Sequence, residues 1–243
     1  MRIAVFSDIH GNLEALSAVL KAIKELAPDK IVCLGDVVGY GASPNECCEL
    51  IREHTNFSIL GNHDAAVSGR MDYNYYYEAA RKALDWCRHS LKEDNLRWLE
   101  QNPYIVVEGD ITFVHGSPID PENFDYIFAP EQARGLLPYA QKLSKITFLG
   151  HSHLCRVFAF FGKTVHEVPP RHFGLRQGYK YIVADGSVGQ PRDYDNRAGF
   201  VIYNSELDTV EYFRVEYDIA SSAEKILRAG LPPNFARRLF LGV

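Results

Sequence analysis

The chain has 243 residues, of which 47% are apolar and 23% are charged, and its formal net charge is −5 at pH 7. This mix is typical of a soluble globular protein, and the length suits one α/β domain that spans residues 1–243. A net negative charge removes the general electrostatic attraction that drives nonspecific nucleic-acid binding, so nucleic acid is disfavoured as a partner.

The cysteines indicate the compartment. There are five, an odd number, and no C-x-x-C pair occurs. They do not form a disulfide framework or a zinc-thiolate site, and we expect buried, reduced thiols in a cytoplasmic protein. The first apolar run, residues 3–6, is too short for a signal peptide or a membrane span. The oligomeric state is open, with a homodimer as one option.

The first half alternates short apolar runs with helical patterns. The predicted strands cover residues 3–6, 30–34 and 57–60, and the predicted helices cover 13–23 and 45–53. Pro44 stands at the start of the second helix, where proline is favoured. Strand–helix–strand order implies parallel strands with crossover helices.

Strands dominate the second half, after one helical pattern over residues 75–101. The predicted strands are 104–108, 111–115, 146–149, 156–161, 164–168, 181–184, 200–203 and 210–215. Two helices, 219–229 and 233–239, close the chain. This order predicts an α/β fold, a four-layer α/β/β/α sandwich of two mixed sheets flanked by helices.

Five predicted strands end at side chains that can bind metals. In chain order these side chains are Asp8 and His10, Asp36, Asn62 with His63 and Asp64, His115, and His151 with His153. Because ligands of α/β folds bind beyond the carboxyl ends of the strands, the five ends can build one site. Carboxylate, amide and imidazole donors without thiolates select divalent ions such as Mn, Fe, Zn or Ni.

Each of these motifs alone has an ordinary structural explanation. Asp-x-His or Gly-Asp after a strand is usually a turn or a helix cap, and a lone His115 is more often a hydrogen-bonded residue near the core. Five of the nine histidines lie at strand ends, however, and random scatter does not place them so. We interpret His54, His89, His166 and His172 as surface or packing residues.

The motifs D-x-H, G-D, G-N-H-D, V-H-G and G-H-S-H, in this order, are similar to the motif set of the calcineurin-like metallophosphoesterases. The similarity extends from residue 1 to about residue 203. Residues 7–12, 34–41 and 186–192 resemble the small prokaryotic members of the phosphodiesterase type.

The resemblance implies a centre of two divalent metal ions, with manganese first and iron, zinc, nickel or cobalt as alternatives. It assigns one ion to Asp8, His10, Asp36 and His153, and the other to Asp36, Asn62, His115 and His151. Asp36 would bridge the two ions.

The resemblance also assigns roles to residues that would contact the substrate. His63 and Asn62 would face the phosphate, and His63 would protonate the leaving oxygen or stabilise its charge. Asp64 would orient His63 by accepting the second N–H of its ring.

Two further features stay open. Arg192 follows a Gly-Ser-Val-Gly turn and could reach a substrate phosphate, or it could be a surface arginine paired with Asp193 or Asp195. The tyrosines at positions 73, 75, 76 and 77 could stack on a base or cover the site. We prefer a packed helix start or an interface for this cluster.

Two cations about 3.5–4 Å apart can clamp the attacking and leaving oxygens of a phosphoryl group. We therefore expect an enzyme, a metal-dependent phosphoesterase that hydrolyses a small phosphate ester. The leading interpretation is a phosphodiesterase acting on a small or nucleotide-like substrate. Alternatives with the same metal core are a phosphomonoesterase, a protein phosphatase and a dinucleoside polyphosphate hydrolase. A non-catalytic binding scaffold is the last alternative.

Overall fold

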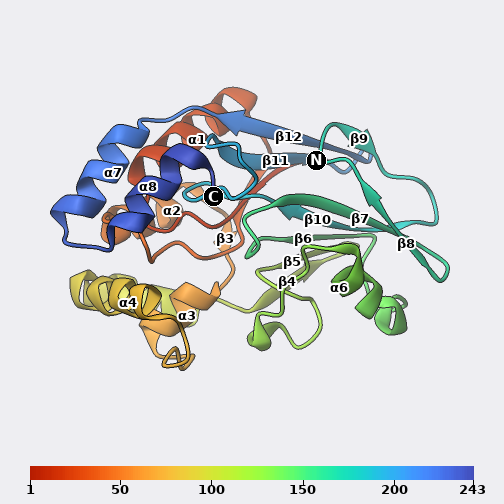
Figure 1. Ribbon diagram of the computed structural model, residues 1–243. Coiled ribbons are helices and arrows are strands. Elements are labelled where there is room, and N and C mark those ends of the chain that lie inside the picture. Colours follow the sequence, from red (N-terminus) through yellow and green to blue (C-terminus); the bar gives the residue numbers. More distant parts are fainter.

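Two six-stranded sheets pack against each other, and helices cover their outer faces (Figure 1). The computed structural model describes all residues from 1 to 243. The predicted four-layer sandwich of two mixed sheets is confirmed. None of the helices is both long and apolar enough to span a lipid bilayer.

The first sheet joins both ends of the chain. Its strand order is β3-β2-β1-β11-β12-β9. In that order the strands are Phe57–Ser58, Lys30–Cys33, Arg2–Phe6, Ala198–Asn204, Thr209–Val215 and Phe173–Gly174. β1, β2 and β3 run parallel, whereas β11 pairs antiparallel with β1. The first strand of the chain therefore depends on a partner strand from its last quarter.

Two crossover helices, α1 (Leu13–Leu26) and α2 (Pro44–His54), connect the three parallel strands. α1 begins where the side chain of Asn12 accepts a hydrogen bond from the Ala15 N–H, the usual N-cap interaction. Because both connections cross over, the carboxyl ends of β1, β2 and β3 lie at one edge of the sheet.

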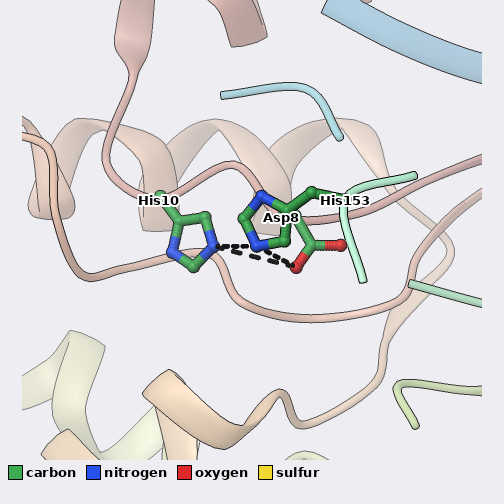
Figure 2. A group of neighbouring side chains, drawn as sticks. All are labelled: Asp8, His10 and His153. Atoms are coloured by element: carbon green, nitrogen blue, oxygen red, sulfur yellow. Dashed lines mark hydrogen bonds and ion pairs between the residues drawn. The ribbon is translucent and has the colours of Figure 1, made fainter. Parts of the chain in front are cut away.

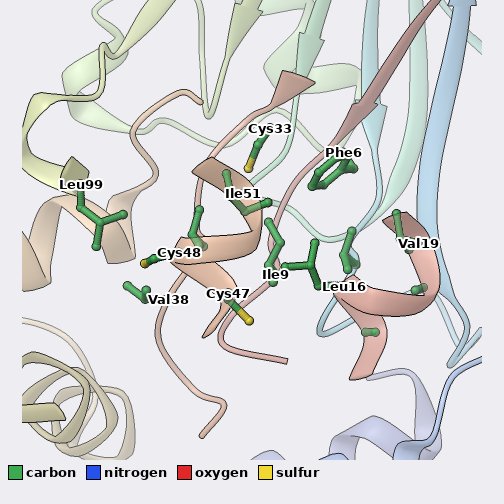
Figure 3. Packing of buried hydrophobic residues seen from close by; sticks show 14 of the residues in the cluster. Phe6, Ile9, Leu16, Val19, Cys33, Val38, Cys47, Cys48, Ile51 and Leu99 are labelled. Atoms are coloured by element: carbon green, nitrogen blue, oxygen red, sulfur yellow. The ribbon is translucent and has the colours of Figure 1, made fainter. Parts of the chain in front are cut away.

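The core between the first sheet and these helices contains four of the five cysteines, and Figure 3 shows three of them, Cys33, Cys47 and Cys48. Cys47 and Cys48 lie on α2 and Cys33 ends β2. Burial raises the pKa of the Cys87 thiol to about 12, so this thiol stays protonated at neutral pH. All five cysteines are buried and free, as predicted.

The second sheet comes from the middle of the chain, in the order β4-β5-β6-β10-β7-β8. Its strands, in that order, are Ile105–Glu108, Ile111–Val114, Ile146–Leu149, Lys180–Asp185, Cys155–Phe161 and Thr164–Val168. β5, β6 and β10 are parallel. A short helix, α6 (Pro130–Gly135), and two 3-10 turns, Pro121–Asn123 and Leu137–Tyr139, belong to the same half of the molecule.

Large apolar side chains fill the space between the sheets. Phe148 is fully buried and lies 5.8 Å from the ring of Phe113 and 5.7 Å from the ring of Tyr203. Phe113 and Phe148 belong to the second sheet and Tyr203 to the first, so these rings join the two sheets.

Some predicted elements need correction. The pattern over 75–101 is not one helix but two, α4 (Glu78–Ser90) and α5 (Glu93–Gln101), because Leu91 takes an extended conformation between them. The strand predicted over 57–60 is only Phe57–Ser58. A short helix that was not predicted, α3 (Asn62–Ser68), begins directly after it. The G-N-H-D motif therefore lies at a helix start.

The last two helices are as predicted. α7 (Ile219–Arg228) begins at Asp218, whose side chain accepts a hydrogen bond from the Ser221 N–H. α8 (Pro233–Leu241) packs against α7. Phe235 of α8 lies 4.7 Å from the ring of Tyr40.

Replacing Phe148 by Ala should lower the free energy of unfolding by about 3–5 kcal/mol, because it leaves a cavity between the sheets. Urea unfolding followed by circular dichroism measures this loss. The matched control is Leu207→Ala, which truncates an exposed side chain and should change stability by less than about 0.5 kcal/mol. Equal losses in both variants would contradict the assigned role of Phe148.

Candidate metal centre

Strand ends from both sheets meet at one place. The structure brings all seven predicted metal ligands together there, and all seven are buried. They follow β1 (Asp8, His10), β2 (Asp36), β5 (His115) and β6 (His151, His153), or begin α3 (Asn62). His54, His89, His166 and His172 are exposed, in agreement with their interpretation as surface residues.

Asp8, His10 and His153 form a first group of potential metal-binding atoms (Figure 2). Nε2 of His153 lies 3.3 Å from Oδ1 of Asp8, and Nε2 of His10 lies 3.7 Å from the same oxygen. The two Nε2 atoms are 3.1 Å apart. Asp8 Oδ1 is buried and has no hydrogen-bond partner. An oxygen and two ring nitrogens thus face one point.

Asp36, His115 and His151 form a second group. Nε2 of His115 lies 3.4 Å from Oδ2 of Asp36 and 3.1 Å from Oδ1 of Asn62. The amide Nδ2 of Asn62 donates a hydrogen bond of 2.7 Å to the hydroxyl of Tyr76. This bond fixes the Asn62 amide with its oxygen towards the second group.

The carboxylate of Asp36 lies between the two groups. Its Oδ2 is 3.6 Å from Nε2 of His10 and 3.4 Å from Nε2 of His115. Its other oxygen, Oδ1, accepts a hydrogen bond of 2.8 Å from the His63 N–H. A Cβ on Gly61 would come within 2.1 Å of Oδ1, so only glycine fits beside this carboxylate.

The donor set fits divalent cations. Atoms bonded at about 2.1 Å to one tetrahedral or octahedral ion lie roughly 3.0–3.4 Å from one another. Separations of 3.1 to 3.4 Å occur in both groups. Oxygen and imidazole donors, together with the unpaired Asp8 Oδ1, match an ion of the Mn, Fe or Zn type.

Backbone carbonyls set the orientation of three of these histidines. Nδ1 pairs with a carbonyl oxygen in each case: His10 with Val38 at 3.2 Å, His115 with Leu34 at 2.7 Å and His153 with Gln190 at 2.6 Å. When Nδ1 carries the proton for such a bond, Nε2 keeps its lone pair for a metal.

The ligand backbone is unusual. Asp8, His10, Asp36, His151 and His153 all have a left-handed conformation, with φ between 49° and 65°. Residues other than glycine adopt this conformation at an energetic cost, and they keep it only where the surroundings fix the chain. Here the two ligand turns bind each other, because the N–H groups of Asp8 and His10 donate to the carbonyls of Gly35 and Asp36.

The turn at residues 186–190 supports the first ligand turn from the other side. The Val188 N–H donates to the carbonyl of Ser7 at 3.0 Å, and the Gly189 N–H donates to the carbonyl of Asp8 at 2.9 Å. Residues far apart in sequence therefore hold Asp8 in place.

The electrostatics of the site keep the carboxylate of Asp36 ionised. Burial alone would raise the pKa of Asp36, but the adjacent imidazoles, His115 first, hold that pKa well below its usual range. Burial opposes the charge on His115 as well, yet Asp36 raises the pKa of His115 above its ordinary range. Burial lowers the pKa of His151 to about 3. Without metal, therefore, the site holds a proton on His115.

His63 differs from the predicted ligands. Its Nδ1 is buried and has no hydrogen-bond partner. It faces Gly39, where a Cβ would come within 2.4 Å of Nδ1. Burial lowers the pKa of His63 to about 3, so the ring is neutral near pH 7. One potential metal group combines His63 with His10 and Asp36, but His63 lacks the carbonyl partner that orients the rings of His10, His115 and His153.

The predicted hydrogen bond between His63 and Asp64 is wrong. The Asp64 carboxylate instead accepts three backbone N–H bonds, from Val37 at 3.2 Å, Val38 at 3.1 Å and Gly61 at 3.3 Å. Asp64 lies at the first turn of α3 and bends back over its start, so its oxygens cannot also reach the ring of His63. Asp64 therefore joins the loop after Asp36 to the start of α3.

Two residues that the sequence reasoning missed lie behind Asp8. The Ser7 hydroxyl contacts Asp8 Oδ2 and lies 2.8 Å from Oδ1 of Asp185. Burial raises the pKa of Asp185 well above its usual range. Asp185 is the last residue of β10, so the strand-end criterion that identified the other residues would also have found it.

Aromatic residues surround the site more closely than predicted. The Tyr40 ring lies 4.6 Å from His10 and 4.4 Å from His63, and the Tyr126 ring stacks on His151 at 3.7 Å. The Tyr75–Tyr77 segment lines a cavity together with Asn62, His63 and His151. Tyr73 and Tyr76 pack against the hydrophobic core, in agreement with the packed helix start that we preferred, so this cluster both packs on the core and lines the cavity.

Arg192 has no carboxylate partner. Asp193 pairs with Arg214 and Asp195 with Arg197, so the predicted alternative of a surface ion pair for Arg192 is wrong. Its guanidinium group lies 6.0 Å from the ring of Tyr40 and donates a hydrogen bond of 3.2 Å to Gln190.

Comparison with known proteins identifies the family. The family model "Calcineurin-like phosphoesterase" matches residues 1–158. The chain is 42% identical to the uncharacterized protein MJ0912 of Methanocaldococcus jannaschii, over 99% of this chain and 98% of that protein. A crystal structure of a metallophosphoesterase from Sphaerobacter thermophilus superposes with a TM-score of 0.86 at 37% identity, over 100% of this chain and 99% of that one.

A further similarity is local. A symmetrical bis(5'-nucleosyl)-tetraphosphatase of Actinobacillus pleuropneumoniae is 30% identical over 111 residues, which are 42% of this chain and 39% of that protein. The chain belongs to the calcineurin-like phosphoesterases and is a metal-dependent phosphoesterase.

Replacing Asp64 by Ala should lower the free energy of unfolding of the metal-free protein by at least about 2 kcal/mol, because three buried N–H groups lose their acceptor. Chemical unfolding measures the loss. Glu100→Ala removes an exposed carboxylate and serves as the control. If both variants unfold at the same denaturant concentration, Asp64 does not support the loops.

Metal binding should depend on pH because a protonated His115 cannot bind an ion. Its pKa is raised, so the proton is present at pH 7.5 and must leave when metal binds. The affinity for Mn²⁺ should therefore fall about tenfold between pH 7.5 and 6.5, with about one proton released per protein. Isothermal titration calorimetry in two buffers of different ionisation enthalpy measures both quantities.

The His115→Asn variant is the control for this titration. It keeps an oxygen that can bind a metal but has no proton to lose, so its affinity should vary less with pH. Uptake of metal by the unaltered protein without proton release would contradict the charge state assigned to His115.

Proposed function

We propose that the protein hydrolyses a phosphodiester of a small, nucleotide-like molecule at a centre of two divalent metal ions, with manganese as the first candidate. The observation that carries this proposal is the position of Asp36. One carboxylate oxygen lies 3.6 Å from the first ligand group at His10 and 3.4 Å from the second at His115. A carboxylate placed in this way can serve two ions at once.

The ions, when bound, neutralise charge on the phosphate and activate a water molecule. The chain supplies the rest. His63 has no ligand role in our assignment and is neutral, so its ring N–H can donate a hydrogen bond to the leaving oxygen as charge develops there. Arg192, which has no carboxylate partner, can hold a non-bridging phosphate oxygen. Asn62 lies next to His63 and can contact the same phosphate.

The space beside the site suits a phosphate ester with a sizeable organic group. A cavity of about 450 Å³ borders Asn62, His63 and His151, and it leaves room for the organic group on phosphorus. The local similarity to a dinucleoside tetraphosphatase supports a dinucleoside polyphosphate as the second candidate substrate.

Two further parts of the proposal rest on other observations. A cytoplasmic location is supported by five buried cysteines without a disulfide. A single domain over residues 1–243 is supported by the first sheet, which pairs β1 with β11.

The role of His63 predicts a dependence on the leaving group. With Mn²⁺, His63→Ala should lower kcat by about 10²–10³-fold on a phosphodiester with an alkyl leaving group. The loss should be much smaller on bis(p-nitrophenyl) phosphate, whose weakly basic leaving group needs little stabilisation of its charge. His89→Ala, an exposed histidine on α4, is the control and should leave both rates unchanged.

The metal content of Asp36→Ala tests metal binding separately from catalysis. This variant should contain at least one metal ion per chain fewer than the unaltered protein. Normal turnover of the alkyl ester by His63→Ala would disprove the role of His63. Absence of turnover with Mn, Ni, Co, Zn or Mg on any phosphate ester would disprove the phosphodiesterase itself.

A further inference from the structure

The cavity beside the metal centre is walled by aromatic rings from separate segments. Tyr75, Tyr76 and Tyr77 come from the segment before α4, Tyr126 from the segment before α6, and Tyr40 from the loop after β2. At about 450 Å³ the cavity lies within the roughly 300–1,000 Å³ that small-molecule sites span.

These rings are not simply part of the core. The exposed fractions of Tyr75, Tyr77 and Tyr126 are 73%, 54% and 47%. Tyr126 is anchored by stacking on His151 at 3.7 Å, and Tyr75 packs edge-on against Tyr76 at 5.0 Å. Exposed aromatic rings gathered around one opening are typical of a binding surface, and anchored rings lose little conformational freedom when a flat ligand stacks on them.

The cavity wall offers no positive charge. No lysine or arginine lines it, and its one ionisable acid is Asp125. The guanidinium group of Arg192 lies 6.0 Å from the ring of Tyr40, and that of Arg238 lies beside Tyr77, but neither arginine lines the cavity. A chain of further phosphates would lack cationic partners along this wall, whereas an uncharged aromatic ring would find stacking surfaces.

The position of His63 determines which part of the substrate enters the cavity. His63, which we place at the leaving oxygen, lines this same cavity. The group that departs with that oxygen therefore occupies the space between the tyrosines.

We propose that this cavity binds the leaving group of the diester and that the leaving group is a nucleoside whose base stacks on Tyr75 and Tyr126. The inference rests on the proposed phosphodiesterase activity and makes it more specific. In the reaction water adds to phosphorus, the bond between phosphorus and the nucleoside oxygen breaks, and a proton goes to that oxygen. A free nucleoside and a phosphomonoester result.

The test compares two substrates that differ only in the base. Adenosine 5'-(methyl phosphate) and 1-O-methylribose 5-(methyl phosphate) carry the same primary alcohol as leaving group. With Mn²⁺, kcat/KM should be roughly 5- to 150-fold higher for the adenosine ester, the range expected for one stacked base. Phosphorus NMR should identify methyl phosphate as the product.

Variants of the lining tyrosines test which rings contact the base. Tyr75→Leu should reduce the preference for adenosine, and Tyr75→Phe should keep it because the ring is retained. Tyr126→Leu should act in the same direction. Tyr139→Leu changes an exposed tyrosine that does not line the cavity and should leave the preference intact.

Three results would overturn the inference: equal kcat/KM for the two esters, AMP and methanol as the products, or a higher kcat/KM for diadenosine tetraphosphate than for the adenosine ester. Hydrolysis of bis(p-nitrophenyl) phosphate is the separate check on the proposed function. If it proceeds without base preference, only the inference fails, and if no ester is hydrolysed with any metal, the proposed function fails.

Discussion

The candidate site depends on one buried carboxylate that faces two groups of potential metal-binding side chains. Burial alone would neutralise Asp36, and the surrounding imidazoles keep it ionised. The same carboxylate binds the His63 N–H at the start of α3 and leaves space for nothing larger than glycine at position 61. The charge of Asp36 thus fixes the local backbone as well as the ligand geometry, and a change at this residue disturbs both.

The ligands reach this carboxylate through strained turns that support one another. The left-handed residues after β1, β2 and β6 would be costly in isolation, but hydrogen bonds between the turns hold them. The residues with the least favourable backbone conformation therefore lie where the metal-binding atoms converge. Backbone carbonyls act in the same way: those of Leu34 and Val38 in the loop after β2 orient His115 and His10, and that of Gln190 orients His153.

The sequence predicted the parts of the molecule that follow local rules. Apolar periodicity located most strands, and the carboxyl ends of those strands located every predicted ligand. Three features depend on tertiary structure and were missed. The break at Leu91 leaves no glycine or proline as a signal, the bonds of Asp64 depend on a loop nearly thirty residues away, and Tyr126 reaches His151 only through the fold. Asp185, by contrast, directly follows a predicted strand, so a search of the strand ends could have found it.

The pairing of β1 with β11 bears on the order in which a growing chain can assemble. All seven proposed ligands lie before residue 154, and the matched family region ends at 158. Yet the first ligand turn is held by residues 188 and 189, and His153 is oriented by Gln190. During translation the ribosome therefore releases a complete set of donors well before the chain that holds them in place. The geometry of the candidate site therefore requires the chain up to about residue 204, where β11 ends.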